Sequence, residues 1–468
     1  MLSRTEAIEA IAGQSFEVVV IGGGITGAGV ALDAASRGYS VALLERDDFA
    51  AGTSSRSSKM VHGGLRYLQN FDLGLVREAL LERQLMVRLA PHLVYPTPFL
   101  VPALGEERRD RRVGIGLNMY DVMAATRTGR GRRGTRSAAE EDQGSYWSPD
   151  RHRTIDREEV VEMVPALASR ELGSAYLFYD CQTDDARLVL TVLGEAERFG
   201  AVMVNGAEVI EVLSSAGRAS GVAFLEAESG ERVEVKAASV VNATGVWADR
   251  LRPEEIVEEE DLPRIAPSRG THLIVDETEL PMGRAACIVP AGEGRAIFAL
   301  PWYGRTLIGT TDNDYEGDIA HPRPAGEDIK YLLDAVNSFF GISLGRPDLV
   351  GAFAGVRPLI STGDPRRSVD ISRKAELYET SSGMLTITGG KLTTWRRMAK
   401  QTVDRLVERE GRDAPCHTAE IPLGMPARPE DLRAPAGVGE ASLAQLAFRY
   451  GHAASAVLDL AGRQPRLA

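Results

Sequence analysis

The residues best suited to chemistry begin near the N-terminus, with three glycines and one acid. Gly22, Gly24 and Gly27 fit the pattern G-x-G-x-x-G. In that pattern the first glycine permits a tight turn, the second lets the backbone approach a pyrophosphate, and the third allows a helix to pack closely on a strand. Glu45 stands eighteen residues after Gly27, where a carboxylate would accept hydrogen bonds from ribose hydroxyls. The combination predicts a dinucleotide site, without separating NAD from FAD.

The segment 52–68 follows Glu45 and is too rich in Ser, Thr and Gly to form core. Its hydroxyl and N–H groups could form a second surface that binds an anionic or sugar-like ligand. The residues assigned here to cofactor binding are Thr53, Ser54, Ser58 and Lys59. Arg66 and Tyr67 add a guanidinium fork, which can bind an anion, and a phenol. A solvated Ser-rich turn is the alternative interpretation.

Three further candidates lie in strand-like or apolar segments. Gly245 ends a strand-like run in NATG, and a glycine there lets the backbone approach a ligand. His272 lies in the alternating segment SRGTHLIV, where a structural histidine is the ordinary alternative. Arg357 has apolar neighbours in AGVRPL, which is unusual for a surface arginine.

A last candidate segment, TGGKLTTWRRMA (388–399), opens a helix. It places Gly390, Lys391 and Thr393 where a helix N-terminus favours an anion or a flavin. The segment is not a P-loop, because G-x-x-x-x-G-K is absent.

These candidates need a strand–helix–strand unit to position them. FEVVVI (16–21) and YSVALLE (39–45) predict buried parallel strands, with a helix through ALDAASRG (31–38) between them. An amphipathic helix is expected over 72–92. Nine arginines between residues 108 and 136 indicate a mobile surface loop over 105–153. Strands are expected within 201–242 and at THLIV, AIFAL and TLIGTT, and helices at 327–340 and 441–461.

Composition limits the class of protein. A chain of 468 residues suggests two or three domains, and a net charge of −12 argues against binding nucleic acid. Cys181, Cys287 and Cys416 are far apart and form no CxxC, so neither a disulfide framework nor a metal site is expected. No stretch is apolar enough to span a bilayer and no secretory signal is visible, so we expect a cytoplasmic protein.

With these segments assembled, the sequence resembles the FAD-dependent glycerol-3-phosphate dehydrogenase family. The resemblance runs from residue 16 to about residue 400. The matching segments include VVVIGGGITGAG, GTSSRSSKMVHGGLRYL, VREALLERQLMVRLAPHL, DDARLVL, VVNATGVWAD, SRGTHLIV, LIGTTD, GVRPL and TGGKLTTWRRMA. HGGLRYL together with GGKLTT separates this family from other flavoproteins of the same fold. The resemblance therefore selects FAD over NAD.

The family implies a glutathione-reductase-like, Rossmann-type α/β domain for FAD and a mixed-sheet cap for the substrate. It implies oxidation of sn-glycerol 3-phosphate to dihydroxyacetone phosphate, by hydride transfer from C2 to flavin N5, with a quinone as electron acceptor. Arg66 and Tyr67 would face the substrate, and Arg373 is a weaker match for the same role. His272, Arg357 and Lys391 would be catalytic; His272 is our first choice as proton acceptor because histidine titrates near neutral pH. An oxidase that uses O2 and a non-catalytic FAD-binding scaffold are the alternatives.

The resemblance also divides the chain. A discontinuous FAD-binding domain is expected over 16–100, 170–261 and 351–405, and substrate or cap regions over 101–169 and 262–350. Residues 425–468 would form a helical C-terminal segment that is shorter than is usual in the family. The arginines at 108–136 suggest reversible, salt-sensitive contact with the inner face of the cell membrane, and a homodimer is left open.

Overall fold

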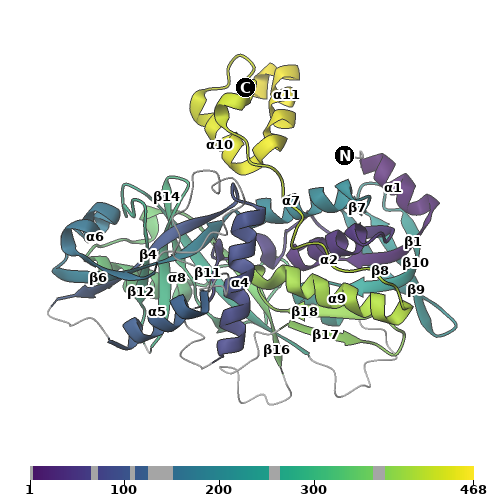
Figure 1. The fold of residues 1–468 in the computed structure, drawn as a ribbon, viewed down its shortest axis with the longest axis horizontal. Coiled ribbons are helices and arrows are strands. Elements are labelled where there is room, and N and C mark those ends of the chain that lie inside the picture. Colours follow the sequence, from purple (N-terminus) through teal and green to yellow (C-terminus); the bar gives the residue numbers. More distant parts are fainter. Residues whose placement is uncertain are drawn as a thin grey trace, which may run out of the picture.

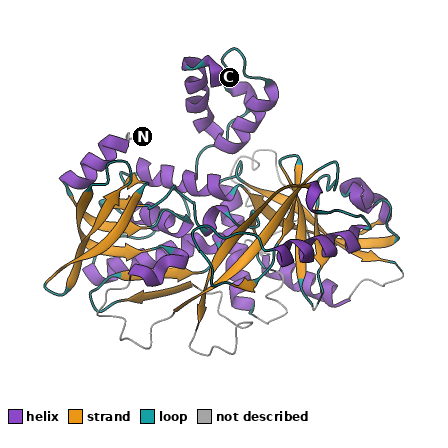
Figure 2. Cartoon of the chain, turned by 180° about the vertical axis from the view of Figure 1, so that it is seen from behind, coloured by secondary structure: helices purple, strands orange, loops and turns teal. Residues whose placement is uncertain are grey.

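The computed structural model describes residues 4–64, 72–105, 111–124, 151–251, 264–292, 294–361 and 375–467. In this part of the chain the strands form two β-sheets, which lie beside each other and are flanked by helices (Figures 1 and 2).

The first sheet is built around β1 (Ser15–Ile21), whose β-branched residues are buried on both faces. β1 pairs in parallel with β2 (Val41–Leu44) on one side and with β10 (Arg232–Asn242) on the other. The strand order is β17-β18-β10-β1-β2-β7, with β9 paired to β10 and β8 paired to β9. The remaining strands of this sheet are β7 (Val202–Val204), β8 (Ala207–Ser215), β9 (Arg218–Glu226), β17 (Ala375–Glu379) and β18 (Leu385–Gly389).

Helices pack on both faces of the first sheet, as a largely parallel sheet requires. α2 (Ile25–Ser36) packs against α7 (Asp185–Arg198) and α9 (Trp395–Glu410) over the face that carries Val18 and Val20. α1 (Arg4–Gly13) buries Ile11 against the other face. The predicted strand–helix–strand unit at residues 16–45 is therefore confirmed.

The second sheet has the order β15-β11-β14-β13-β12-β4-β6-β3, with β16 paired to β11 and β5 paired to β6. The predicted strands at THLIV, AIFAL and TLIGTT are confirmed within β11, β13 and β14. The strands of this sheet are β3 (Met60–Val61), β4 (Val94–Leu104), β5 (Arg153–Asp156), β6 (Leu172–Thr183), β11 (Arg264–Asp276), β12 (Ala286–Pro290), β13 (Ala296–Trp302), β14 (Arg305–Gly309), β15 (Asn313–Asp314) and β16 (Leu349–Ser361).

One face of the second sheet packs on α6 (Arg157–Met163) and α8 (Gly326–Phe340), and the other on α4 (Leu73–Leu89) and α5 (Arg111–Ala124). The predicted helices at 72–92 and 327–340 are confirmed by α4 and α8. The predicted surface loop over 105–153 is wrong for α5.

The reason for that error is that Leu117, Tyr120 and Ala124 recur at helical spacing and are buried against Val76 and Leu80 of α4. The surrounding arginines obscured this apolar stripe in the sequence. Residues 106–110 and 125–150, which carry most of those arginines, lie outside the described residues.

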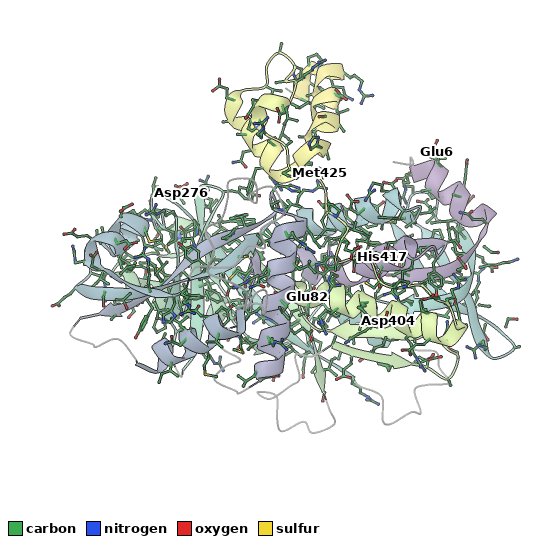
Figure 3. All side chains as sticks on the ribbon, in the orientation of Figure 1. Glu6, Glu82, Asp276, Asp404, His417 and Met425 are labelled. Atoms are coloured by element: carbon green, nitrogen blue, oxygen red, sulfur yellow. The ribbon has the colours of Figure 1, made fainter. Side chains whose placement is uncertain are left out.

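The C-terminal helices α10 (Glu440–Tyr450) and α11 (Ala454–Arg463) stand above the two sheets (Figure 1) and confirm the helices predicted at 441–461. Met425 lies at their base (Figure 3), where its carbonyl oxygen accepts a hydrogen bond from the N–H of His452 at 2.8 Å. Arg449 of α10 forms an ion pair with Asp184 at 2.6 Å, which ties the helices to the start of α7.

The strands of the two sheets alternate along the chain more often than the domain boundaries expected from the sequence. β4 begins within the expected FAD-binding segment 16–100, and β6 lies within 170–261, yet both strands belong to the second sheet. β16 pairs with β11 of the second sheet although it lies largely within the expected FAD-binding segment 351–405. The chain passes between the sheets more often than those boundaries assume, because strand pairing depends on partners that are distant in sequence.

Candidate active site

The glycine-rich turn joins β1 to α2 at the wall of a large cavity. Gly22 has a φ of +108°, in the left-handed region that L side chains rarely adopt. A Cβ on Gly27 would lie 1.9 Å from the carbonyl oxygen of Gly22, so no side chain fits between the turn and the helix. Gly24 precedes α2 without a capping side chain, and Ile25 and Thr26 line the cavity. A helix that begins in this way is suited to a phosphate group.

Glu45 stands just after β2 and braces this turn. Its Oε2 accepts a hydrogen bond from the N–H of Gly23 at 2.7 Å, and its Oε1 accepts one from the N–H of Asp47 at 2.8 Å. Burial raises the pKa of Glu45, and these two N–H groups oppose that shift. Each carboxylate oxygen can accept a second hydrogen bond, so Glu45 can still bind a ribose hydroxyl.

The cavity has a volume of about 730 Å³ and is lined by both sheets and the segments between them. Most of the residues that the sequence predicted for the site line this cavity. They are Gly22, Gly24, Glu45, Thr53, Ser54, Ser58, Gly245, His272, Arg357, Gly390, Lys391 and Thr393. Gly27 and Lys59 are not among the lining residues; Gly27 lies beneath the turn, and Asp185 holds the Lys59 ammonium at 2.7 Å. Arg66, Tyr67 and Arg373 lie outside the described residues.

His272 is held between two strands and a neighbouring ring. It lies on β11, is 2% exposed, and stacks on Phe353 of β16 with the ring centroids 4.7 Å apart. Its Nε2 lies 2.9 Å from Ser58 Oγ, while its buried Nδ1 has no hydrogen-bond partner among the described residues. Burial, then the positive charges of Arg357 and Lys59, lower the pKa of His272 to about 3.

The environment of His272 corrects one expectation from the sequence. We expected a proton acceptor that titrates near neutral pH. The structure instead holds the imidazole neutral over the whole physiological range, because a proton on it would be buried beside two cations.

Arg357 lies on β16 opposite Ser268 of β11. Its guanidinium donates to Asp312 Oδ1 at 3.1 Å, to Thr310 Oγ1 at 3.2 Å and to the carbonyl oxygen of Thr311 at 3.1 Å. These contacts hold the planar fork at the cavity wall, where it can meet a phosphate or carboxylate.

Space for the Arg357 fork comes from a glycine on the neighbouring strand. A Cβ on Gly270 would lie 2.6 Å from an Arg357 nitrogen, so a larger residue at this position would displace the guanidinium.

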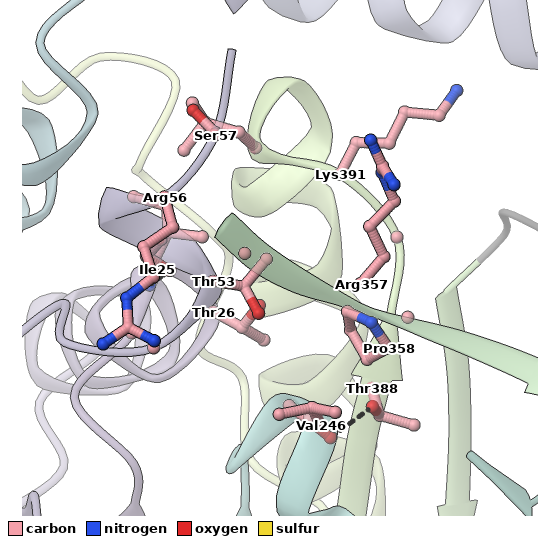
Figure 4. A pocket seen from close by; sticks show the side chains of 18 of the residues that line it. Ile25, Thr26, Thr53, Arg56, Ser57, Val246, Arg357, Pro358, Thr388 and Lys391 are labelled. Carbon is pink, nitrogen blue, oxygen red and sulfur yellow. Dashed lines mark hydrogen bonds between the residues drawn. The ribbon is translucent and has the colours of Figure 1, made fainter. Parts of the chain in front are cut away.

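Lys391 follows two glycines at the end of β18. Gly389 and Gly390 have φ values of +75° and +67°, which turn the chain from the strand towards α9. Figure 4 shows Lys391 and Arg357 on one side of the pocket and Arg56 on the other. The pocket therefore has cationic side chains on both sides.

Several lining residues were not predicted from the sequence, among them His62, Trp247, Arg56 and Asp312. His62 lies within HGGLRYL and Trp247 within NATGVWAD, so both motifs pointed to the right segment but not to these side chains. His62 donates its backbone N–H to Thr393 Oγ1 at 3.2 Å, which joins the two motifs across the cavity.

The residues present fit FAD. The turn around Gly22 and Gly24 leaves room for a pyrophosphate, and Glu45 can accept from a ribose. Trp247 lines the same cavity, and its buried indole N–H has no partner among the described residues, so a ligand acceptor can satisfy it. The Arg46 guanidinium lies 4.9 Å from the Trp247 ring and stiffens this wall.

Comparisons with known proteins agree with this geometry. The sequence matches the FAD dependent oxidoreductase family over residues 17–396. It is 35% identical to the aerobic glycerol-3-phosphate dehydrogenase of Bacillus subtilis, over 98% of this chain and 82% of that protein. It is 39% identical to glycerol-3-phosphate dehydrogenase 1 of Mycobacterium bovis, over 97% of this chain and 85% of that protein.

Solved structures give the same result. The glycerol-3-phosphate dehydrogenase from Bacillus halodurans, complexed with FAD, superimposes with a TM-score of 0.69 at 32% identity, over 90% of this chain and 70% of that chain. The L-α-glycerophosphate oxidase from Mycoplasma pneumoniae, with FAD bound, has a TM-score of 0.62 at 16% identity, over 84% of this chain and 95% of that chain, and supports the fold alone. The fold class expected from the sequence is therefore confirmed.

Proposed function

Because the chain belongs to the family of FAD-dependent glycerol-3-phosphate dehydrogenases, we propose that it oxidises sn-glycerol 3-phosphate to dihydroxyacetone phosphate and passes the electrons to a quinone. The observation that carries this proposal is a single cavity that contains both the pyrophosphate turn and His272, Arg357 and Lys391. FAD, when bound, accepts the hydride that leaves C2 of the substrate.

The chain's first task is to hold the cofactor. The start of α2 would bind the pyrophosphate through backbone N–H groups, and Ser54 Oγ, which accepts from the N–H of Ile25 at 2.9 Å, fixes the first turn of that helix. Glu45 would hold the ribose, and its hydrogen bond from the N–H of Gly23 stabilises the turn at the same time.

The second task is to bind a phosphate dianion. Arg357 offers a planar fork that is already oriented by Asp312 and Thr310, and Lys391 adds a compact positive charge. Arg66 and Arg373 stay candidates for the same role, and Tyr67 stays a candidate for contact with the substrate. Charge-assisted hydrogen bonds of this type distinguish glycerol 3-phosphate from glycerol.

The third task is to accept the proton of the C2 hydroxyl. We assign this to His272, which is neutral before substrate binds. A phosphate dianion on Arg357 would offset one of the two positive charges that lower the pKa of His272, so substrate binding itself would make the imidazole more basic. Lys391 and an arginine-polarised water are the second choices.

The proposed dehydrogenase and the oxidase alternative differ in the electron acceptor, which is a quinone in the first and O2 in the second. Within the described residues, each helix is too short or too polar to cross a membrane. Contact with a membrane surface through the arginines between 108 and 136 stays a proposal. Co-sedimentation with anionic liposomes at low and high salt tests it, with an Arg130→Gln/Arg132→Gln/Arg133→Gln variant as the comparison; equal sedimentation of the two proteins removes this segment from the proposal.

Anaerobic reduction of the bound flavin tests the main proposal. sn-Glycerol 3-phosphate should bleach the flavin absorbance and glycerol should not. A flavin that stays oxidised with glycerol 3-phosphate would support the scaffold alternative. The reduced enzyme is then mixed with a soluble quinone or with O2. Fast reoxidation by O2 and none by the quinone would replace the dehydrogenase proposal by an oxidase.

A further inference from the structure

The segment DDARLVL (184–190) was part of the sequence resemblance but has no place in the mechanism above. It opens α7 with two adjacent carboxylates. Asp184 caps the helix by accepting from the N–H of Arg187 at 3.0 Å, and it pairs with Arg449 of the C-terminal helix α10. Asp185 faces a different part of the molecule, and its side chain is only 1% exposed.

Asp185 gathers donors from one short segment at the cavity. Its Oδ2 accepts from Ser57 Oγ at 2.6 Å and from the N–H of Ser57 at 3.2 Å, and its Oδ1 accepts from Lys59 Nζ at 2.7 Å. Lys59 also donates to the carbonyl oxygen of Ser55 at 2.5 Å and adopts a left-handed φ of +60°. A buried carboxylate with several donors from residues 57–59 fixes the path of that segment.

Ser58 lies in the chain between Ser57 and Lys59, the two residues that Asp185 holds. The hydroxyl of Ser58 lies 2.9 Å from His272 Nε2. The ammonium of Lys59 lies 5.4 Å from the centre of the Phe353 ring, on which His272 stacks. Asp185 therefore has two effects beside His272. It fixes the position of Ser58, the hydrogen-bond partner of His272, and it offsets part of the positive charge of Lys59.

We propose that Asp185 is a positioning residue, which holds the segment Ser57–Lys59 so that Ser58 orients His272 and the positive charge of Lys59 is partly offset beside it. The effect on catalysis rests on the proposed function; the effect on Lys59 does not.

Asp185→Asn is the principal test, and Asp184→Asn is its matched control. The two substitutions make the same chemical change at neighbouring positions. Asn is a good helix cap, so the control retains the start of α7. In Asp185→Asn the rate of flavin reduction at saturating glycerol 3-phosphate should fall about ten- to a hundredfold, because small displacements of reacting groups have effects of this size. The substrate concentration for half-maximal rate should change much less, and Asp184→Asn should match the wild type in both.

A second readout needs no substrate. Labelling of the holoenzyme with an amine reagent, followed by peptide mass spectrometry, reports how firmly Lys59 is held. Lys59 should label at least about tenfold faster in Asp185→Asn than in the wild type or in Asp184→Asn, because its ion pair is lost. If glycerol 3-phosphate fails to reduce even the wild-type flavin, the proposed function fails while this readout still decides the role of Asp185.

Two further variants keep the test decisive. Asp185→Asn/Lys59→Met removes both members of the pair and should reduce its flavin faster than Asp185→Asn, because the unbalanced charge beside His272 is gone. If Asp185→Asn does not retain FAD, Asp185→Glu takes its place: it keeps the charge, so Lys59 should stay protected while the displaced segment slows reduction. Wild-type reduction and wild-type labelling in Asp185→Asn, or equal effects in Asp184→Asn, would overturn the proposal.

Discussion

Acid should destabilise this protein through His272, and the size of the effect follows from its surroundings. The pKa of His272 is lowered from 6.5 to about 3 by burial, Arg357 and Lys59. Between these two pH values the unfolded chain therefore binds one proton that the folded chain does not bind. His272 costs no stability above pH 6.5, and stability is lost progressively as the pH falls from there towards about 3.

The magnitude at mildly acidic pH does not depend on how low the folded-state pKa is. At about pH 5 the unfolded histidine is almost fully protonated, whereas the folded one is neutral. Linkage then gives a loss of roughly 2 kcal/mol between about pH 8 and about pH 5 from this residue alone. His272→Asn removes the titrating group, so its stability should fall by about 2 kcal/mol less than that of the wild type over the same interval.

Urea unfolding of the holoenzyme at the two pH values, followed by tryptophan fluorescence and circular dichroism, measures this difference. Contributions from other groups cancel when the two pH differences are subtracted. Ser58→Ala is the control, because it removes the hydrogen bond to His272 but keeps the buried imidazole. It should retain the wild-type acid loss. Equal acid losses in the wild type and in His272→Asn would refute the argument that this histidine is buried beside cations.

Three further predictions concern the cofactor and the substrate. Gly27→Ala should purify without flavin absorbance, because the added Cβ would lie 1.9 Å from the carbonyl oxygen of Gly22. Glu45→Ala should weaken FAD retention by roughly 1.5–3 kcal/mol, the value of a charge-assisted hydrogen bond, measured by the fluorescence of released FAD; unchanged retention would mean that Glu45 does not reach the ribose. Arg357→Lys should raise the half-saturating concentration of glycerol 3-phosphate about ten- to a hundredfold in anaerobic bleaching, because the charge stays but the planar fork is lost. Equal reduction by glycerol and by its phosphate would show that Arg357 has another partner.

The sequence alone determined the cofactor end of the site, because that end depends on short-range sterics. The turn at Gly22, the close approach at Gly27 and the acid at Glu45 all lie within one strand–helix–strand unit of about thirty residues. Only glycine satisfies the backbone conformation of the turn and the packing beneath it, so the residue types report the geometry directly.

The tertiary structure decided the substrate end. His272 and Arg357 are 85 residues apart in the sequence and lie on two strands that pair with each other. The charge that lowers the pKa of His272 also comes from Lys59, more than two hundred residues earlier. Burial and electrostatic interaction depend on such distant neighbours, so the sequence could propose a histidine base but not its protonation. For the same reason Lys59 was expected at the cofactor, whereas its buried partner Asp185 holds it away from the cavity lining.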